Sequence, residues 1–383
     1  MSAAGTAPAS GTWSAPGRVN LIGDHTDYNG GFALPCALPR RTVVRARRRD
    51  DERLHARSAG AEEPLEAGLP GSPGEVGGWG AYVAGVAWAL REAGHPVPGA
   101  DLVIDGDVPL GAGLSSSHSL ECAVALALTG LAGLELPVAE LARIVQRAEN
   151  DYVGAPTGLL DQTASLASVA DHLTFFDARE ESVRAVPCDL AGAGLELLVI
   201  DTRATHALTD GAYGSRRDAC ERAARRLGVA TLRELVENGE DGADGGERAA
   251  VARLEALADD PEALRRARHV VTENARVLQV VGLVEAGRYR EVGPVLSASH
   301  VSMRDDFENS VPEVDLAVET AEGAGALGAR MTGGGFGGSV VALVEAAGRA
   351  GVEVAVREAY ADAGHDEPAF LAVVPSRGAG RDD

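Results

Sequence analysis

Residues 16–31 read PGRVNLIGDHTDYNGG, a run of charged and hydrogen-bonding residues where a fold would ordinarily place apolar ones. Neither a spacing of two nor one of 3.6 organises these polar residues, so we expect an irregular loop after a short apolar start. Glycines at its end permit tight bends of the backbone. The polar residues that define the cluster are Arg18, Asn20, Asp24, His25, Asp27, Tyr28 and Asn29.

Apolar residues flank this loop on both sides, with Leu21 and Ile22 inside its start and residues 32–34 after it. We therefore expect the loop to run through the body of a domain. Buried polar groups need partners, and the hydroxyls of a polyhydroxylated ligand can supply them. The cluster predicts a sugar or polyol site; the alternative is a polar turn that satisfies its own hydrogen bonds.

The composition is that of a globular protein, with 24% charged and 45% hydrophobic residues. A length of 383 residues predicts two domains. The sequence contains no lysine, since all 35 basic residues are arginine. This excludes a P-loop lysine, a protein-kinase strand lysine and a Schiff-base lysine. Any phosphate must therefore be bound by backbone amides, arginine and metal.

The formal net charge of -22 argues against binding to nucleic acid or to an anionic membrane. The four cysteines form no C-x-x-C pair, so neither a zinc site nor a disulfide framework is indicated. We find no secretory signal pattern and no apolar run long enough to cross a bilayer. These observations predict a cytoplasmic protein.

Hydrophobic spacing predicts several elements. We expect strands near residues 43–44, 102–104 and 195–200, and helices over 79–90, from Leu120 onward and over 141–148. Glu149 lies at the margin of the apolar face of the last of these helices, where a carboxylate can reach into a site or remain at a wet edge. The acidic, glycine-rich residues 237–247 predict a loop. The simplest domain boundary lies near residues 180–195.

A second ligand-binding pattern, PLGAGLSSS, occupies residues 109–117 and runs directly into the helix that begins near Leu120. Gly111 and Gly113 let backbone amides approach a ligand, the serine hydroxyls add donors, and a helix N-terminus adds partial positive charge. This segment predicts an anion cradle that needs no lysine. An ordinary serine-capped helix is the alternative.

Residues 333–338 contain a formal G-x-G-x-x-G, but the residues after them read as a strand and not as a helix. We therefore reject a dinucleotide site and expect a tight turn between strands, beside the nucleotide. Asp161 follows Pro156 at what reads as a helix start. Its leucine neighbours predict partial burial, which favours a functional role over a surface carboxylate.

Taken together, these segments resemble the galactokinases, members of the GHMP family of small-molecule kinases. Residues 16–31 are similar to the galactokinase signature, 109–117 to the family's phosphate loop and 329–339 to its third motif. Further matches are Glu149 with Asn150, 158–162, Tyr213 with Arg216 and Arg217, 272–276, and 300–307.

The resemblance implies an α+β, two-domain GHMP kinase fold with the active site in the cleft between the domains. Residues 12–188 would form an N-terminal domain like domain 2 of ribosomal protein S5, and residues 189–383 a ferredoxin-like C-terminal domain. The implied reaction is the ATP-dependent phosphorylation of α-D-galactose at its C1 hydroxyl, which is the galactokinase step of the Leloir pathway. The implied partners are galactose, ATP and Mg²⁺, and the implied protein is a monomer.

Residue roles follow from the same resemblance. Asp161 would be the catalytic carboxylate and Arg18 the group that stabilises the transition state, while Ser117 and Glu149 would hold magnesium. The residues implied to bind the sugar are Asp24, His25, Thr26, Asp27, Gly158, Asp161 and Tyr213. The residues implied to bind ATP are Gly111, Ala112, Gly113, Leu114, Ser115, Ser116 and Ser117.

Two departures from the family pattern bear on the site. Most relatives have Glu where this chain has Asp24, so the carboxylate is one methylene shorter and its reach to a sugar hydroxyl is reduced. His118 replaces a small residue directly after the phosphate loop, where it can crowd the nucleotide or add a pH-dependent charge. A further expectation concerns Asp161, whose pKa should be lowered by a helix start and by Arg18.

Two alternative functions remain open at this point. One is a kinase for a related sugar, N-acetylgalactosamine or arabinose. The other is a non-catalytic galactose sensor, which is disfavoured because Arg18, Asp161, Ser117 and Glu149 are all present.

Overall fold

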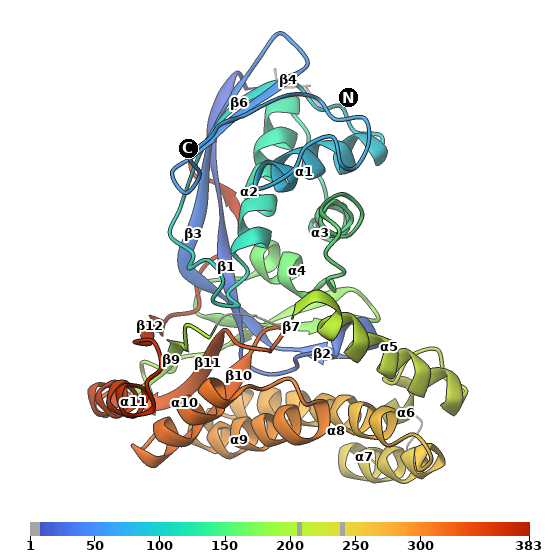
Figure 1. Cartoon of the computed structure of the whole chain (residues 1–383), viewed down its shortest axis with the longest axis vertical. Helices are drawn as coiled ribbons and strands as arrows, with labels where there is room; N and C mark the ends of the chain where they lie inside the picture. The colour runs from blue at the N-terminus through green and yellow to red at the C-terminus, as the bar shows by residue number, and fades with distance from the viewer. Residues whose placement is uncertain (1–7, 205–208, 238–241) are drawn as a thin grey trace.

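The computed structural model describes residues 8–204, 209–237 and 242–383. Two long strands, β1 (Ser10–Asn20) and β3 (Pro35–Arg48), run together from one end of the molecule to its middle (Figure 1). They pair antiparallel, with a register shift between Pro16 and Arg18. The loop that joins them, together with β2 (Phe32–Ala33), carries the polar cluster into the other half of the molecule.

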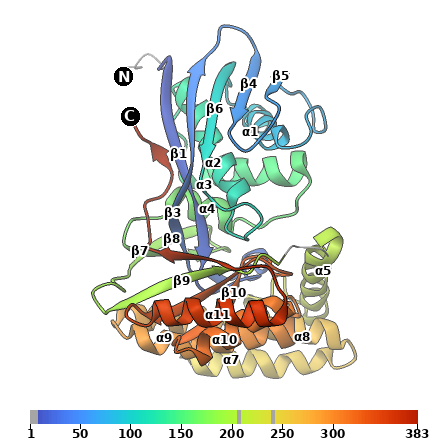
Figure 2. The ribbon, with the colours of Figure 1, turned by 60° about the vertical axis from the view of Figure 1, so that its left-hand side comes forward.

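The N-terminal half is a sheet with helices on one face (Figures 1 and 2). Its strand order is β13-β1-β3-β6-β4-β5, and only β4 and β6 pair in parallel. The strands not yet described are β4 (Arg53–Ser58), β5 (Leu65–Gly68), β6 (Ala100–Gly106) and β13 (Gly380–Arg381). The helices are α1 (Gly80–Glu92), α2 (Ser116–Ala132), α3 (Val138–Arg147) and α4 (Leu160–Ala167). A π-helical segment (Ala148–Val153) extends α3.

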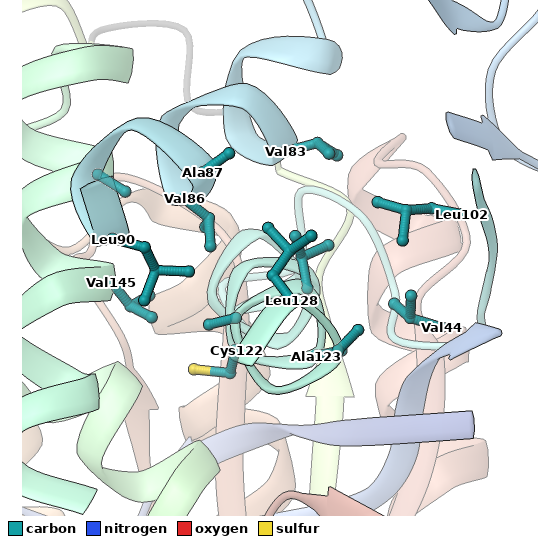
Figure 3. Packing of buried hydrophobic residues seen from close by; sticks show 14 of the residues in the cluster. Val44, Val83, Val86, Ala87, Leu90, Leu102, Cys122, Ala123, Leu128 and Val145 are labelled. Atoms are coloured by element: carbon teal, nitrogen blue, oxygen red, sulfur yellow. The ribbon is translucent and has the colours of Figure 1, made fainter. Parts of the chain in front are cut away.

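Helix α2 lies at the centre of the first core. Figure 3 shows Leu128 of α2 between the sheet residues Val44 and Leu102 and the α1 residues Val86 and Leu90. All five side chains are almost fully buried. A buried helix with apolar residues on several faces needs cover on several sides, which the sheet, α1 and α3 provide. The first turn of α2 is thereby fixed, and the phosphate-loop pattern precedes it.

A small sheet of β2, β7 (His172–Asp177) and β8 (Ser182–Pro187) lies between the halves. Leu173 of β7 and Val186 of β8 belong to a core cluster that also contains Leu21 and Ile22 of the polar loop and Val277 of the long helix α8 (Pro261–Glu285). The two halves of the molecule therefore share one apolar core.

The C-terminal half has a four-stranded antiparallel sheet of order β10-β11-β9-β12, with helices over one face (Figures 1 and 2). Numbered along the chain, the order is 4-1-3-2, with helical connections before the second and fourth strands, which is the predicted ferredoxin-like arrangement. Its strands are β9 (Leu195–Asp201), β10 (Gly328–Thr332), β11 (Ser339–Glu345) and β12 (Ala369–Val373).

Helix α8 is the longest helix of this half and illustrates how its ends are set. Pro261 occupies its first turn, and the side chain of Asp260 accepts a hydrogen bond from the Ala263 amide, which is an N-cap. The helices are α5 (Thr209–Leu227), α6 (Glu234–Glu237), α7 (Gly242–Arg253), α8 (Pro261–Glu285), α9 (Val292–Ser302), α10 (Pro312–Gly323) and α11 (Arg349–Ala363). Shorter helical turns are Asp27–Asn29, Leu254–Leu257, Tyr289–Glu291 and Met303–Phe307.

The strands and helices predicted from hydrophobic spacing are confirmed, including the turn between β10 and β11 at residues 333–338. The loop predicted over residues 237–247 is wrong in part. Residues 238–241 lie outside the described residues, but α7 begins at Gly242. The prediction gave too much weight to the glycines. The Arg-Ala-Ala-Val-Ala run that follows them favours a helix, and α7 packs against α8 with Ala250 buried. No helix among the described residues is long and apolar enough to span a membrane.

Candidate active site

A cavity of about 310 Å³ opens where the polar loop, the start of α2 and the start of α4 meet the β10–β11 turn. Every one of these segments comes from a different part of the sequence. The lining residues are Arg18, Asp24, His25, Asp27, Gly111, Gly113, Leu114, Ser115, Ser116, Ser117, His118, Thr157, Gly158, Leu160, Asp161, Tyr213, Gly333 and Gly334.

The Pro16–Arg18 register shift aims the Arg18 side chain into this cavity. An irregularity of this kind in a strand pair redirects one side chain. The Arg18 amide donates to the Leu114 carbonyl at 3.1 Å, which brings β1 against the phosphate loop. Gly17 is required there, because a Cβ at this position would lie 2.7 Å from the same carbonyl oxygen.

Arg18 and Asp161 form a bidentate pair. Nε and Nη2 of Arg18 each lie 2.7 Å from one oxygen of Asp161, and Ser115 Oγ donates to Asp161 Oδ2 at 2.6 Å. Burial alone would raise the pKa of Asp161, but the charges of Arg18 and His118 outweigh burial and hold it at about 2. The predicted direction of this pKa shift is confirmed, and the carboxylate is ionised at neutral pH.

Asp24 lies nearly fully buried where the polar loop lines the cavity. Its Oδ2 is 2.6 Å from Nη2 of Arg330, and its Oδ1 accepts a hydrogen bond from the Gly333 amide at 3.1 Å. Burial raises the pKa of Asp24, and the charge of Arg330 opposes that rise. Both oxygens therefore have partners inside the protein.

His25 is held in a left-handed backbone conformation with φ of 62°, which is unusual for a residue with a side chain. Its Nδ1 lies 2.9 Å from the Tyr28 hydroxyl, and its Nε2 lies 3.1 Å from the Gly334 carbonyl. Tyr213 packs against the ring, with centroids 5.3 Å apart. Burial, followed by the nearby His269, lowers the pKa of His25 to about 3, so its imidazole is neutral.

Asp27 and Gly158 approach each other closely at the start of α4. A Cβ on Gly158 would lie 1.7 Å from Asp27 Oδ2, so any side chain at this position would displace the Asp27 carboxylate. Burial raises the pKa of Asp27 to about 6, and the charge of Asp161 adds to that rise. The Tyr28 and Leu160 amides oppose it by hydrogen bonding.

The segment 111–117 has the backbone form of an anion cradle. Gly111, Gly113 and Ser115 all have positive φ, and α2 begins at Ser116, so successive amides turn toward the helix N-terminus. Arg18 Nη1 donates to the Gly113 carbonyl at 2.7 Å. The β10–β11 turn packs behind the loop, with a Cβ on Gly333 only 3.0 Å from the Gly113 carbonyl oxygen.

Glu149 reaches the same region from the π-helical segment that follows α3, and only 3% of its surface is exposed. Its Oε1 accepts from Ser117 Oγ at 3.2 Å, and its Oε2 accepts from Thr157 Oγ1 at 3.0 Å. His118 Nε2 lies 2.5 Å from Glu149 Oε2, and His118 Nδ1 lies 3.4 Å from Asp161 Oδ2. A neutral hydroxyl and a carboxylate beside a phosphate cradle are oxygen donors of the kind that Mg²⁺ prefers.

Among the described residues, no group of three or more acidic, histidine or cysteine side chains is arranged to hold a metal ion. A magnesium ion at Ser117 and Glu149 would thus need further oxygens from phosphate and water. That requirement fits Mg²⁺, which keeps several waters and is commonly bound through one or two carboxylates plus substrate phosphates.

Three residues predicted for the site, Thr26, Ala112 and Glu149, do not line the cavity. The hydroxyl of Thr26 donates to the Gly23 and Phe32 carbonyls, so it shapes the polar loop from inside. The side chain of Ala112 is buried in the shared core. All other residues predicted to bind sugar or nucleotide line the cavity, and Glu149 contacts it through Ser117 and His118.

Helix α8 supplies contacts to which sequence reasoning gave no role. Glu273 accepts from the Gly23 amide at 3.1 Å, Asn274 accepts from the Phe32 amide at 2.8 Å, and His269 Nε2 lies 3.1 Å from the Asp24 carbonyl. These three side chains hold both ends of the polar loop. Glu273, Asn274 and Arg330 lie in segments that matched the family pattern, and this was the available signal.

Comparisons with known proteins agree with this geometry. Residues 2–48 match the model of the galactokinase galactose-binding signature. A galactokinase of Streptomyces coelicolor is 52% identical over 373 residues, which cover 97% of this chain and 94% of that protein. The chain belongs to the galactokinase family. A galactokinase of Mycobacterium tuberculosis is 48% identical over 96% of this chain and 98% of its own length.

The remaining comparisons concern the fold of this galactokinase family member. Residues 81–168 match the GHMP kinase N-terminal domain and residues 280–362 the GHMP kinase C-terminal domain. The crystal structure of Lactococcus lactis galactokinase complexed with galactose aligns with a TM-score of 0.88 and 32% identity, covering 98% of this chain and 96% of that one. Methanococcus jannaschii mevalonate kinase shares the fold, with a TM-score of 0.61 at 15% identity over 96% of this chain and 98% of its own. The predicted GHMP kinase fold is confirmed.

Proposed function

We propose that this protein transfers the γ-phosphoryl group of ATP to the C1 hydroxyl of α-D-galactose, giving galactose 1-phosphate and ADP. One observation carries the proposal. The Arg18–Asp161 pair lies in the wall of a single cavity. The pair is hydrogen-bonded to Gly113 and Ser115 of the segment 111–117, and residues of the polar loop line the same cavity. Phosphoryl transfer depends mainly on alignment and on stabilisation of charge, and this arrangement provides both.

The proposed roles follow from the contacts. Asp161 orients the C1 hydroxyl and accepts its proton, while Arg18 stabilises the charge that develops on the transferred oxygens. On the sugar side, the lining residues that present acceptors, donors or an aromatic face are Asp24, His25, Asp27, Gly158 and Tyr213. The amides of residues 111–117 and the N-terminus of α2 bind the phosphates.

We propose Mg²⁺ as the metal, held by Ser117 and Glu149 together with phosphate and water oxygens. When bound, it would neutralise phosphate charge near the transferred group. The Ser117–Glu149 contact of 3.2 Å supports this assignment. In a Mg²⁺ titration with excess ATP, Glu149→Gln should require more metal for half-maximal rate than the unsubstituted protein. An identical titration curve would contradict the role of Glu149.

The division into residues 12–188 and 189–383 is proposed for the two domains, with residues at the C-terminus crossing back to pair with β1. We also propose that the protein is a monomer. Sedimentation at micromolar concentration tests the monomer. The cytoplasmic location stays a prediction.

An ADP-release assay with a panel of sugars tests the function. Galactose should support turnover, ³¹P NMR should identify a C1 phosphate, and Asp161→Asn should serve as the matched inactive control. Turnover with N-acetylgalactosamine or arabinose but not with galactose would reassign the substrate. Galactose binding with no turnover on any sugar would indicate the sensor.

A further inference from the structure

Arg330 lies behind the sugar side of the cavity, does not line it, and has 0% of its surface exposed. It projects from β10, and its Nη1 donates to the Leu21 carbonyl at 3.1 Å and the Asn20 carbonyl at 3.5 Å. Its Nη2 lies 2.6 Å from Asp24 Oδ2. The guanidinium of Arg330 therefore contacts both the end of β1 and the carboxylate of Asp24 in the polar loop.

A fully buried guanidinium needs compensating negative charge, because the desolvation of an unpaired ion is costly. Arg330 has two carboxylates within 4 Å of its Nη2, Asp24 Oδ2 at 2.6 Å and Glu273 Oε1 at 3.8 Å. Glu273 is paired in turn with Arg276 at 2.7 Å. The result is an alternating row of charges, Asp24, Arg330, Glu273 and Arg276, of which only Asp24 reaches the cavity.

Glu273 links this row of charges to the backbone of the polar loop. Its Oε1 accepts from the Gly23 amide at 3.1 Å and from Ser299 Oγ at 2.6 Å. Because Gly23 directly precedes Asp24, the carboxylate that balances Arg330 also fixes the backbone from which the Asp24 side chain extends. The position of Asp24 is thus set twice, at its main chain by Glu273 and at its carboxylate by Arg330.

We propose that Arg330 is a positioning residue for sugar binding, which fixes the direction in which the Asp24 carboxylate faces the cavity. The inference rests on the proposed function. Without Arg330, Asp24 would be a buried carboxylate that keeps the Gly333 amide as a partner but has lost its ion pair. It would then rotate or take up a proton, and in either case it would be a poorer acceptor for sugar hydroxyls.

Arg330 touches no residue of segment 111–117, so the proposal places its effect on sugar affinity and not on ATP. The test uses the full chain with Arg330→Met, which keeps most of the volume and removes the charge. Galactose binding is measured by calorimetry without nucleotide, and KM and kcat by ADP release. We expect the galactose Kd and KM to rise by about tenfold, corresponding to the loss of a charge-assisted contact, with kcat and the ATP KM within about threefold.

A double-mutant cycle separates positioning from a general structural role. Asp24→Asn should also weaken galactose binding, and Arg330→Met in the Asp24→Asn background should weaken it no further. Losses that multiply, or equal falls in kcat and ATP affinity, would overturn the proposal. The matched control is Arg290→Met, because Arg290 pairs with Glu345 on the surface at 2.8 Å and should leave galactose binding unchanged.

A second variant keeps the test informative if Arg330→Met does not fold. Arg330→Lys retains the charge but not the planar fork, so it should fold and bind galactose with an intermediate Kd. Failure of both variants to fold would assign Arg330 to the core and reject the positioning role. If the unsubstituted protein binds galactose but releases no ADP, the proposed function fails while the calorimetric cycle still decides the role of Arg330.

Discussion

Arg18 holds Asp161 in a side-on pair, with both nitrogen–oxygen distances at 2.7 Å. The same guanidinium donates to the Gly113 carbonyl of the phosphate loop. One side chain therefore fixes the proposed catalytic carboxylate relative to the backbone of residues 111–117, which we propose binds the nucleotide. Because the pair lowers the pKa of Asp161 to about 2, this carboxylate is a weak base with a permanent charge. A weak base is sufficient if the proton of the sugar C1 hydroxyl is transferred late in the reaction, as expected for a loose phosphoryl-transfer transition state.

The first prediction concerns Asp161→Asn, which keeps the shape of the side chain and removes its charge. We expect kcat to fall by about 10²–10⁴-fold, the range typical of a lost acid–base group. ATP binding should be largely intact, because the amides of residues 111–117 are unaffected. Steady-state ADP release and calorimetry with a non-hydrolysable ATP analogue measure the two quantities. A near-normal kcat would remove Asp161 from its proposed role.

The second prediction concerns Asp24→Glu. Asp24 lines the cavity, and its Oδ2 lies 2.6 Å from Nη2 of Arg330. An additional methylene should let the carboxylate keep this contact and extend further toward the sugar. We expect the galactose KM to fall by about threefold to tenfold, a gain of the order of one hydrogen bond. A KM that is unchanged or raised would mean that the aspartate already makes its contact.

The third prediction concerns His118, which is buried between Glu149 and Asp161. Burial lowers its pKa, but the two carboxylates outweigh burial and raise the pKa above the usual 6.5. A raised histidine pKa contributes stability that is complete below pH 6.5 and is lost as pH rises through the folded-state value. His118→Ala should therefore lower stability by about 3 kcal/mol at pH 6, the cost of breaking a buried pair, and by less at pH 9.

Urea unfolding without nucleotide at the two pH values measures the His118 effect. His95→Ala is the control, because the partner of His95, Glu140, has 41% of its side chain exposed. Exposed pairs contribute about 0–1 kcal/mol, so the control should change little. An equal loss at pH 6 and pH 9 for His118→Ala would show that the residue contributes packing and not charge.

The sequence patterns predicted the structure correctly where it depends on residues that are close together in the chain. The polar cluster in residues 16–31 lacks any periodicity, and it is a loop; Gly111 and Gly113 permit a tight turn, and they have positive φ before α2. Asp161, preceded by two leucines at a helix start, is partly buried as predicted. In each case the residues that decide the structure are neighbours in the chain.

The contacts that sequence reasoning missed join distant segments. Arg330 occupies β10, whose residues are all buried, and neither Glu273 nor Asp24 can be identified as its partner from spacing, because they lie on α8 and in the polar loop. Thr26 shows the opposite error. Its place in the signature suggested a sugar contact, whereas its hydroxyl bonds the loop's own carbonyls. Pairing between distant segments decides the case of Arg330, and hydrogen bonding within the loop decides that of Thr26.

The last prediction is a pH dependence carried by Asp27. Burial raises its pKa to about 6, so it is charged above that pH and accepts hydrogen bonds from sugar hydroxyls more strongly there. The galactose Kd should fall as pH rises from 5 to 7 and then level off. His25 does not titrate in this range, since its pKa is about 3. Calorimetry at four pH values, with Asp27→Asn compared at each, isolates the contribution of Asp27.

The same shift predicts an effect of opposite sign on stability. A carboxylate whose pKa is higher in the folded than in the unfolded chain destabilises the fold above the folded pKa, and this cost disappears below the unfolded value. Asp27→Asn should therefore be more stable than the unsubstituted protein at pH 8, by about 3 kcal/mol for a shift of about two pH units, and equally stable near pH 4. Galactose affinity would be lost while stability is gained. A variant that loses both at pH 8 would show that Asp27 supports the loop and does not bind the sugar as a charged acceptor.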